Sequence, residues 1–320
     1  RFPWLATKTV GPNGIATSAI YDSFGRQLEE IRADGTRSRT ERHWCSNNNG
    51  CPFAFAKFYE KTESTGSAPS ITYFDELGRA VASESQGYDD GMVRPIYTET
   101  RYNNLGFVIW ATKPYFAGDV VYKASTSYDV LGRPVTLIDA QNQTSTIAYN
   151  GLSVTYTNPK GQSRTEIVNA LGQKTQTTDH LGGNVWYGYD AFLNMVYMKD
   201  QAGNETKIAY NIRGHKIKMQ DPDQGLWEYT YYADGSLKTQ KDAKGQITTS
   251  TYDVLNRLKT RRDHDGKTAT WVYDTCLYGK GKLCSVSDGT YAESFAYDSL
   301  GRPTLNTSTI DGVSYSFTNR

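Results

Sequence analysis

Residues 189–210 read YDAFLNMVYMKDQAGNETKIAY, and the pattern that starts at Tyr189 starts again at Tyr210. The interval of 21 residues recurs along much of the chain, although one interval is two residues shorter and the last is three residues longer. A fixed period of this length indicates about twelve repeat units, with a looser register before Tyr128. The column of tyrosines and their substitutes comprises Tyr128, Tyr149, Val168, Tyr189, Tyr210, Tyr231, Tyr252, Tyr273 and Tyr297.

A second column, made of Asp and Asn, keeps the same period and shares the two-residue deletion. Because two independent columns change at the same place, they belong to one repeating unit. We therefore predict irregular repeats with long insertions over residues 1–127 and regular 21-residue repeats over 128–320, continuous with the first part. The second column comprises Asp139, Asn158, Asp179, Asp200, Asp221, Asp242 and Asp263.

Most units contain two copies of one local signal, in which Asp or Asn is followed three residues later by Gly. The Asp or Asn side chain accepts local backbone hydrogen bonds, and Gly takes the left-handed conformation that a type I turn with a bulge needs. Turns every ten or eleven residues leave room for strands of about six residues. The sequence thus predicts an all-β fold, an antiparallel meander of about 24 strands. Examples are Asp22/Gly25, Asp75/Gly78, Asp129/Gly132, Asn211/Gly214, Asp200/Gly203 and Asp242/Gly245.

The strands that lead into the tyrosine column carry their larger side chains on one face. Ile208 and Trp271 each stand two residues before a column tyrosine, and residues two apart in a strand share a face. We expect one face of the sheet to be aromatic and aliphatic and the other to be small or polar.

Composition limits the function. The 24 Tyr and 29 Gly favour strands and tight turns, and 35 Lys and Arg against 34 Asp and Glu leave a net charge of +1. Without a basic field, nucleic acid is not an expected partner. The longest apolar run, Phe107 to Ala111, is far too short to span a membrane, so we expect no membrane span. The chain begins with Arg1 rather than Met, and we expect any export signal to lie outside it.

A recurring motif, Tyr-Asp-x-x-Gly-Arg, stands at residues 21–26, 128–133 and 297–302, with looser copies at 74–79, 102–107 and 252–257. In phase with the 21-residue period, this motif resembles the RHS/YD-repeat family. That family includes the B and C subunits of bacterial Tc toxin complexes, polymorphic Rhs toxins, bacterial wall-associated proteins and animal teneurins. The segments around Arg42, Trp44, Cys45 and Cys51, and Lys113 to Gly118, resemble the Tc B-subunit branch.

The resemblance implies a curved, spiralling sheet that forms part of a hollow shell. In toxin members of the family, such a shell encloses a C-terminal toxic segment until delivery. The implied partners are the remaining repeats of the parent chain, the enclosed toxin segment and toxin-complex subunits, and the implied location is secreted or associated with a bacterial cell envelope. This chain departs from a complete member because it lacks a recognisable autoproteolytic core and a variable toxin segment.

No residue pattern predicts catalysis, a cofactor or a metal. Asp221 to Leu226 reads Asp-Pro-Asp-Gln-Gly-Leu, similar to a self-cleavage string of the family, yet Asp221 is in register with the turn column and is explained by it. One carboxylate per repeat does not supply the six to eight oxygens of a calcium site. The four histidines stand in no triad or zinc spacing, and we expect surface or turn roles for His43, His180, His215 and His264.

The four cysteines fall into two close pairs, Cys45/Cys51 and Cys276/Cys284. Disulfides in an exported protein and free thiols in a reducing cytosol both fit this spacing. His43 with Cys45 and Cys51 would give three zinc ligands without a fourth nearby, which disfavours zinc.

Two functions from different classes follow. The leading hypothesis is a non-enzymatic shell segment of an RHS/YD-repeat toxin-type protein. The alternative is an adhesive or carbohydrate-binding array on the cell envelope, in which exposed tryptophans stack on sugar rings. The tryptophans that this alternative would use are Trp186, Trp227 and Trp271.

Overall fold

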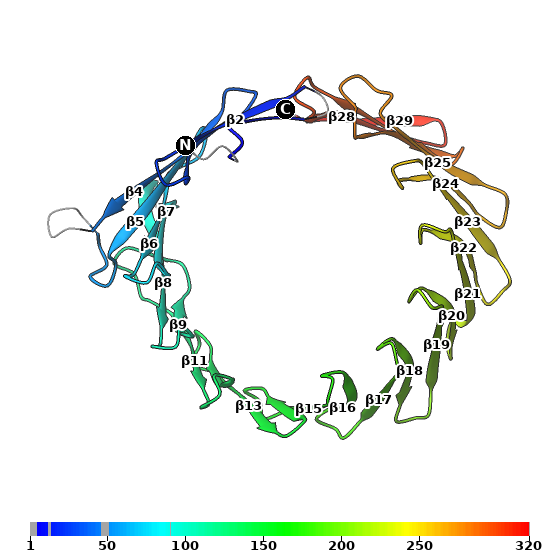
Figure 1. The fold of residues 1–320 in the computed structure, drawn as a ribbon, viewed down its shortest axis with the longest axis horizontal. Coiled ribbons are helices and arrows are strands. Elements are labelled where there is room, and N and C mark those ends of the chain that lie inside the picture. The colour runs from blue at the N-terminus through cyan, green and yellow to red at the C-terminus, as the bar shows by residue number, and fades with distance from the viewer. Residues whose placement is uncertain (1–4, 12–13, 46–50, 90, 320) are drawn as a thin grey trace. The chain divides into compact units, whose positions relative to one another are not determined.

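A computed structural model describes residues 5–11, 14–45, 51–89 and 91–319 of the chain. These residues form 29 β-strands joined by turns, and no helix occurs within the described ranges (Figure 1). The predicted all-β fold of antiparallel hairpins is therefore confirmed. Two compact units divide the chain between Arg164 and Thr165.

The first unit contains the longer and less regular strands. Successive strands pair antiparallel, except that β8 pairs with both β9 and the short β10, and β9 pairs with β11. Its strands are β1 (Lys8–Val10), β2 (Ala16–Tyr21), β3 (Gln27–Ile31), β4 (Arg37–Trp44), β5 (Phe58–Ser64), β6 (Ser70–Phe74), β7 (Ala80–Asp89), β8 (Met92–Tyr102), β9 (Val108–Thr112), β10 (Tyr115–Phe116), β11 (Lys123–Tyr128), β12 (Pro134–Ile138), β13 (Thr144–Asn150) and β14 (Ser153–Thr157).

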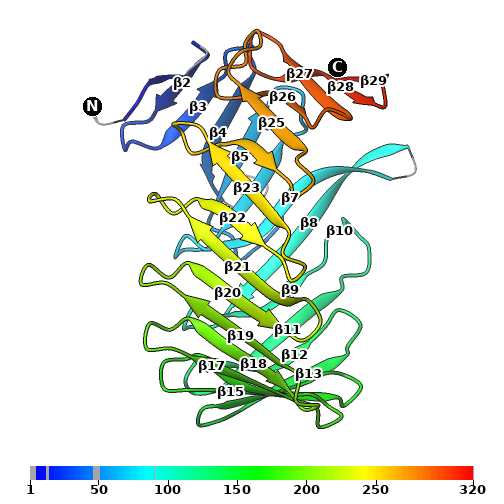
Figure 2. The same cartoon turned by 90° about the vertical axis from the view of Figure 1, so that its right-hand side faces the viewer.

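The second unit is an uninterrupted meander in which every strand from β15 to β28 pairs antiparallel with the next (Figure 2). Its strands are β15 (Ser163–Val168), β16 (Lys174–Thr178), β17 (Asn184–Tyr189), β18 (Met195–Asp200), β19 (Glu205–Tyr210), β20 (Lys216–Asp221), β21 (Gly225–Tyr231), β22 (Leu237–Lys241), β23 (Ile247–Tyr252), β24 (Leu258–Arg262), β25 (Thr268–Tyr273), β26 (Leu283–Ser287), β27 (Tyr291–Tyr297), β28 (Pro303–Ile310) and β29 (Val313–Thr318).

The number of strands exceeds the predicted 24 because insertions form strands instead of loops. The chain between Thr36 and Thr65 pairs as a long β4–β5 ladder, and Tyr115–Phe116 adds β10. Both features lie in the first unit, where the repeat register of the sequence is loose. Another strand, β29, follows the last tyrosine of the repeat column.

The turns have the predicted chemistry, as the one at Asp129 illustrates. The amide of Gly132 donates to the Asp129 carbonyl at 3.0 Å, and the Asp129 amide donates to the Arg133 carbonyl at 2.9 Å. Gly132 has φ +78°, and the ladder slips by one residue at Tyr128. This combination is a type I turn with a glycine bulge. The same left-handed position is held without glycine by Asn142, Leu193 and Asn256.

The described residues form a single layer of sheet with little interior. The one cluster of buried hydrophobic residues lies in the first unit, where Phe53 and Ala56 pack on Tyr73, Val81 and Ala82 of β6 and β7. In the described part of the second unit, only Ala269 and Cys284 are buried hydrophobic residues. Hydrogen-bonded strand pairing and side-chain contacts between neighbouring hairpins must therefore supply most of the stability there.

Candidate functional site

The column tyrosines connect each repeat to the one before it. The Tyr189 hydroxyl donates to the carbonyl of Lys174 at 2.9 Å, and Tyr231 does the same to Lys216 at 2.7 Å. In each case the acceptor is the first residue of the return strand of the preceding hairpin, that is, the strand that follows the previous Tyr-column turn. These return strands are β16 and β20 here. The same bond is made by Tyr102 to Ala80, Tyr128 to Val108, Tyr149 to Pro134 and Tyr297 to Leu283.

The arginine of the Tyr-Asp-x-x-Gly-Arg motif connects a repeat to the following one. The Arg133 Nε donates to Asp129 Oδ2 at 2.8 Å, and its guanidinium lies over the ring of Tyr149 at 4.1 Å from the centroid. Arg257 stacks in the same way on Tyr273 at 4.3 Å. Where the motif lacks arginine, other flat side chains take its place: Phe107 stacks on Tyr128 and His215 on Tyr231. The repeats that contain both contacts are joined to the hairpins on either side of them.

The turn aspartates are held as carboxylates. The backbone amide of Arg133 donates to Asp129, and this bond, followed by the Arg133 guanidinium and the Leu131 amide, holds the pKa of Asp129 below its usual value against a smaller effect of burial. The amide of Arg257 lowers the pKa of Asp253 in the same way. These carboxylates stabilise turns, and their charge is already matched by arginine.

The two faces of the second unit differ in chemistry, as the strand register shows. On the face of the column tyrosines, Met219 pairs with Ile208 on one side and Trp227 on the other. We call this the aromatic face. On the opposite face, hydroxyl side chains pair across consecutive strands, and the bonds Thr230 Oγ1 to Thr239 Oγ1 and Thr251 Oγ1 to Thr260 Oγ1 are 2.5 and 2.6 Å. We call this the hydroxyl face, and its rows include Thr230/Thr239/Thr249, Thr251/Thr260/Thr270 and Ser285/Ser294/Thr307/Ser316.

The three tryptophans proposed for sugar stacking do not form one exposed row. Trp227 and Trp271 lie on the aromatic face, whereas Trp186 pairs with Gln176 and Lys199 on the opposite face. All three are half-buried rather than exposed. Their exposure was predicted wrongly because the sequence does not show that neighbouring hairpins cover their rings.

Asp221 is a turn residue, as predicted. Its Oδ1 accepts hydrogen bonds from the amides of Asp223 and Gln224, both at 3.0 Å. Its Oδ2 accepts the Thr206 hydroxyl at 2.8 Å. These bonds, the Gln224 amide first, lower the pKa of Asp221, and they use its lone pairs for the β20–β21 turn.

The cysteines form two disulfides, Cys45–Cys51 and Cys276–Cys284, with Cα–Cα distances of 5.6 and 5.5 Å. The alternative of free thiols is therefore wrong, and a zinc site using Cys45 and Cys51 is ruled out because their sulfurs are bonded to each other. His43 instead stacks on Tyr59 and lies 3.3 Å from Glu41. Within the described ranges, no group of three His, Cys, Asp or Glu could hold a metal ion.

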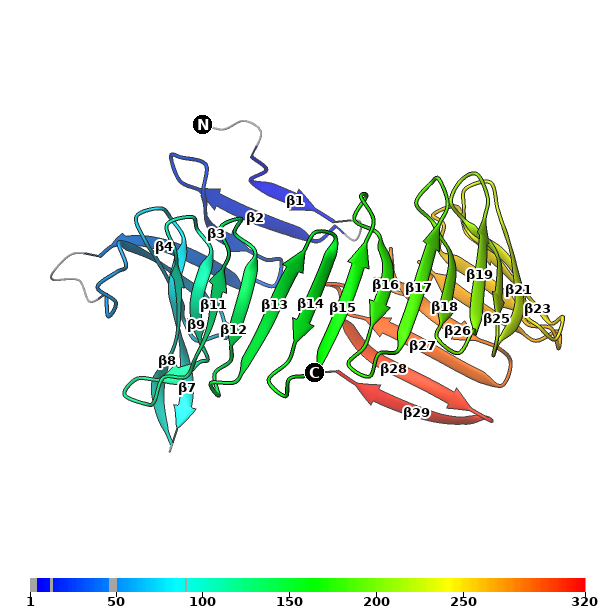
Figure 3. The ribbon, with the colours of Figure 1, turned by 90° about the horizontal axis from the view of Figure 1, so that it is seen from below.

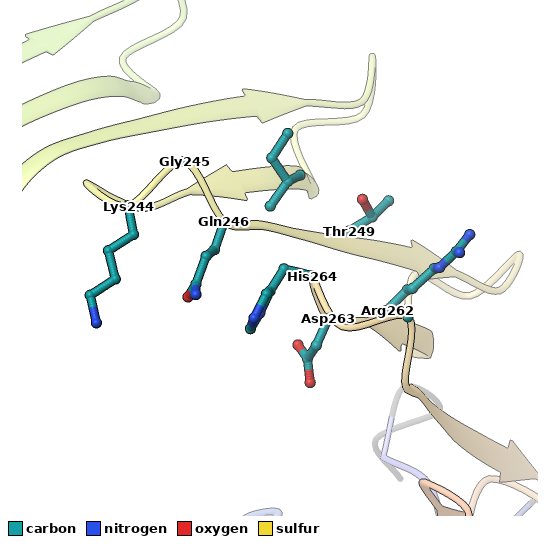
Figure 4. Close-up of a pocket in the computed structure, with 9 residues that line it drawn as sticks. Lys244, Gly245, Gln246, Thr249, Arg262, Asp263 and His264 are labelled. Carbon is teal, nitrogen blue, oxygen red and sulfur yellow. The ribbon is translucent and has the colours of Figure 1, made fainter.

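Shallow grooves run between neighbouring turns. Figure 4 shows one of about 490 Å³, with Lys244 and Gln246 from one turn and Asp263 and His264 from the next. The Asp263 carboxylate is engaged there, since Oδ1 accepts the Thr248 hydroxyl and Oδ2 pairs with Arg261. Similar grooves of about 430 and 450 Å³ separate turns at the opposite edge. The positions of these grooves follow the spacing of the repeat.

Comparisons with known proteins gave matches among solved structures. No protein-family model matches the chain, and no curated protein matches it. Among solved structures, the crystal structure of TcdB2-TccC3 matches at a TM-score of 0.39 and 14% identity, over 96% of this chain and 22% of that one. The Photorhabdus luminescens Tc holotoxin pore with the TccC3-D651A mutation matches at 0.39 and 13% identity, again over 96% and 22%. This chain thus spans about a fifth of the length of those proteins.

Of the described residues, none belongs to a helix with the length and apolar character that crossing a bilayer requires.

Proposed function

We propose that this chain is a non-catalytic wall segment of an RHS/YD-repeat toxin-type protein, which encloses a toxic cargo until delivery. The observation that carries the proposal is the single layer of hairpins, in which the column tyrosine of several repeats and the side chain in the arginine position join neighbouring hairpins. A one-layer sheet covers more area per residue than a globule does, and its continuous ladder of backbone hydrogen bonds leaves no opening between strands.

Two further features support a barrier. The Tyr-Asp-x-x-Gly-Arg motif, by which the sequence resembles the family, makes contacts between repeats: Tyr128 donates to the Val108 carbonyl, and Arg133 lies over the Tyr149 ring. Both cysteine pairs are oxidised, which suits an exported protein of a bacterial cell. The partners would be the remaining repeats of the parent chain, the enclosed segment and toxin-complex subunits.

The experiment is a cryo-electron microscopy map of the parent protein, together with protease digestion of its C-terminal segment. We expect a central space and a segment that is cut only after the shell is opened by denaturant. A filled globule, or a C-terminal segment that is cut at the same rate with and without denaturant, would contradict enclosure. Saturable binding in a glycan screen with no central space would instead support the envelope-adhesion alternative.

A further inference from the structure

Four of the five turns that follow the column positions between β15 and β24 carry a large apolar residue that is at least 70% exposed, namely Leu171, Phe192, Ile212 and Val254, and the turn at 232–235 carries none. We call these turns, residues 169–172, 190–193, 211–214, 232–235 and 253–256, the Tyr-side edge, and those after β15 and β17 lie at the same edge of the sheet (Figure 3). Ile212 is 97% exposed, Phe192 is 79% exposed, and Val254 is fully exposed. Turn positions ordinarily hold Gly, Pro, Asn, Asp and Ser, so a row of such residues needs an explanation.

The opposite edge lacks this row. Across its turns from 179 to 266, all of which are described, Leu181 is the one large apolar residue with strong exposure, at 82%. The two central positions of the neighbouring turns hold small, proline or polar residues, among them Gln201, Lys244 and His264. The apolar character thus belongs to one edge of the sheet and not to its turns in general.

Aromatic grooves lie between turns of the Tyr-side edge, one on each side of the turn at 232–235. One groove lies between the turns at 211–214 and 232–235 and is lined by His215, Tyr229 and Tyr231. The next lies beyond the second of these turns and is lined by Tyr232 and Tyr252. Turns and grooves share one spacing of two strands, about 9–10 Å. A second edge of the same kind, shifted by one strand, would place its apolar turns in these grooves.

The charges on the Tyr-side edge are few and of both signs, which favours contact with an identical edge. Arg257 neutralises the Asp253 carboxylate at 2.6 Å, and Asn194 donates to Asp190 at 3.0 Å. The turns that begin at Asn169 and Asn211 have no charge at that position, while Arg213 and Asp234 on neighbouring turns give one charge of each sign. Like-charge repulsion, which usually opposes the pairing of identical surfaces, is therefore small.

We propose that the Tyr-side edge of the second unit is an interface for a second copy of this chain. The two edges would pack antiparallel around a two-fold axis, so that residue Ile212 of each copy enters a groove of the other. Five turns spaced about 9–10 Å apart give an edge of about 40 Å, comparable with the breadth of a standard patch of about 800 Å² per partner. The proposal does not depend on enclosure of a cargo.

The test is the molar mass of the 320-residue chain, measured by light scattering and sedimentation equilibrium from about 1 to 100 µM. The unmodified chain is expected to reach twice its 35.8 kDa, and the double variant Ile212→Ser with Val254→Ser to raise the dissociation constant at least tenfold. Both residues are solvent-exposed, and circular dichroism and thermal melting check that the variant folds. Leu181→Ser, which changes a strongly exposed apolar residue on the other edge, is the matched control and is expected to leave the dimer intact.

Three results would overturn the proposal. A chain that stays at 35.8 kDa up to 100 µM has no such interface. Equal weakening by Leu181→Ser would indicate non-specific apolar association, and species that grow without limit would exclude a closed two-fold pair. None of these outcomes bears on a central space in the parent protein, so the two proposals fail independently.

Discussion

The two units stabilise the same kind of hairpin in different ways. In the first unit, the segment from Cys51 to Lys57 packs Phe53 against Tyr73 and buries part of one face of the sheet. In the second unit, the described residues contain no comparable cluster, and each hairpin is held by its neighbours. The difference shows that this repeat folds without a core, and that a core appears where an insertion in the repeat supplies one.

The tyrosine hydroxyls show the same contrast. Tyrosine hydroxyls donate to backbone carbonyls in both units, and in the first unit two further tyrosines donate to carboxylates, Tyr73 to Glu84 at 2.7 Å and Tyr115 to Glu99 at 2.6 Å. Burial, followed by the hydrogen bond to glutamate, raises the pKa of both phenols. Side-chain networks of this kind depend on the insertions, while the carbonyl bonds depend only on the repeat.

The largest effect is expected from removal of the buried ring in the first unit. Phe53→Ala should cost about 3–5 kcal/mol because it leaves a cavity against Tyr73, and amides of β6 and β7 should exchange faster with deuterium. Phe24→Ala, which truncates an exposed ring in the same unit, should change stability by less than about 0.5 kcal/mol. Equal effects of the two variants would show that the cluster is not a core.

The next effect concerns the disulfide that closes the longest turn of the second unit. Replacing Cys276 and Cys284 by Ser should cost about 2–3 kcal/mol, because a short closed loop loses its restraint in the unfolded chain. Denaturant titration with and without reductant measures the loss, and the reduced unmodified chain should match the variant in β25 and β26. If the reduced chain kept its full stability in β25 and β26, the disulfide would not stabilise these strands as proposed.

A smaller loss of stability is expected when a single hydrogen bond from a column tyrosine to a backbone carbonyl is removed. Tyr231→Phe removes the bond to the Lys216 carbonyl and should cost about 1 kcal/mol. Tyr210→Phe is the control, because within the described part of the chain the Tyr210 hydroxyl makes no hydrogen bond. Urea titration of both variants should separate them, and equal costs would mean that ring packing, not the hydroxyl, joins the repeats.

A substitution is expected to increase the stability of the chain where a turn lacks its glycine. Leu193 has φ +70° at the position where other turns have Gly, so Leu193→Gly should stabilise the chain by about 0.5–1 kcal/mol. Gly132→Ala is the reverse case and should destabilise, since its Cβ would also lie 2.7 Å from the Phe107 ring. Melting temperatures of the two variants should move in opposite directions.

The smallest effect is the dependence on pH, because the turn ion pairs are exposed and screened. The folded pKa values of Asp129, Asp253 and Asp298 are lowered, chiefly by backbone amides of Arg133, Arg257 and Arg302. The stability that these three carboxylates contribute to the folded state is therefore fully present above the unfolded pKa of about 3.9. It is lost as the pH falls through the folded pKa. The destabilisation by Asp253→Asn should shrink between pH 6 and about pH 2 in melting experiments. Asn169→Ala, at the same turn position but without a titratable carboxyl group, is the control and should show no such trend.

The sequence predicts what is decided locally and misses what depends on distant contacts. The turns at Asp129 and Asp200 follow from side chains within five residues, so their positions and chemistry were predictable. Two contacts that the sequence did not predict join segments 15 or more residues apart: Phe53 packs on Tyr73, and the Tyr231 hydroxyl donates to Lys216. The partial burial of Trp186 depends on the neighbouring strands. The disulfides were left open because pairing depends on compartment as well as on spacing.

The direction of the tyrosine bonds has a consequence for synthesis. Each of these hydroxyls belongs to a later hairpin and donates a hydrogen bond to the return strand of an earlier hairpin, as Tyr189 does to the Lys174 carbonyl. A hairpin that has just left the ribosome is therefore unfinished until the following twenty or so residues emerge. The array should consolidate vectorially, one hairpin behind the growing end, and the newest hairpin should always be the one most open to a chaperone.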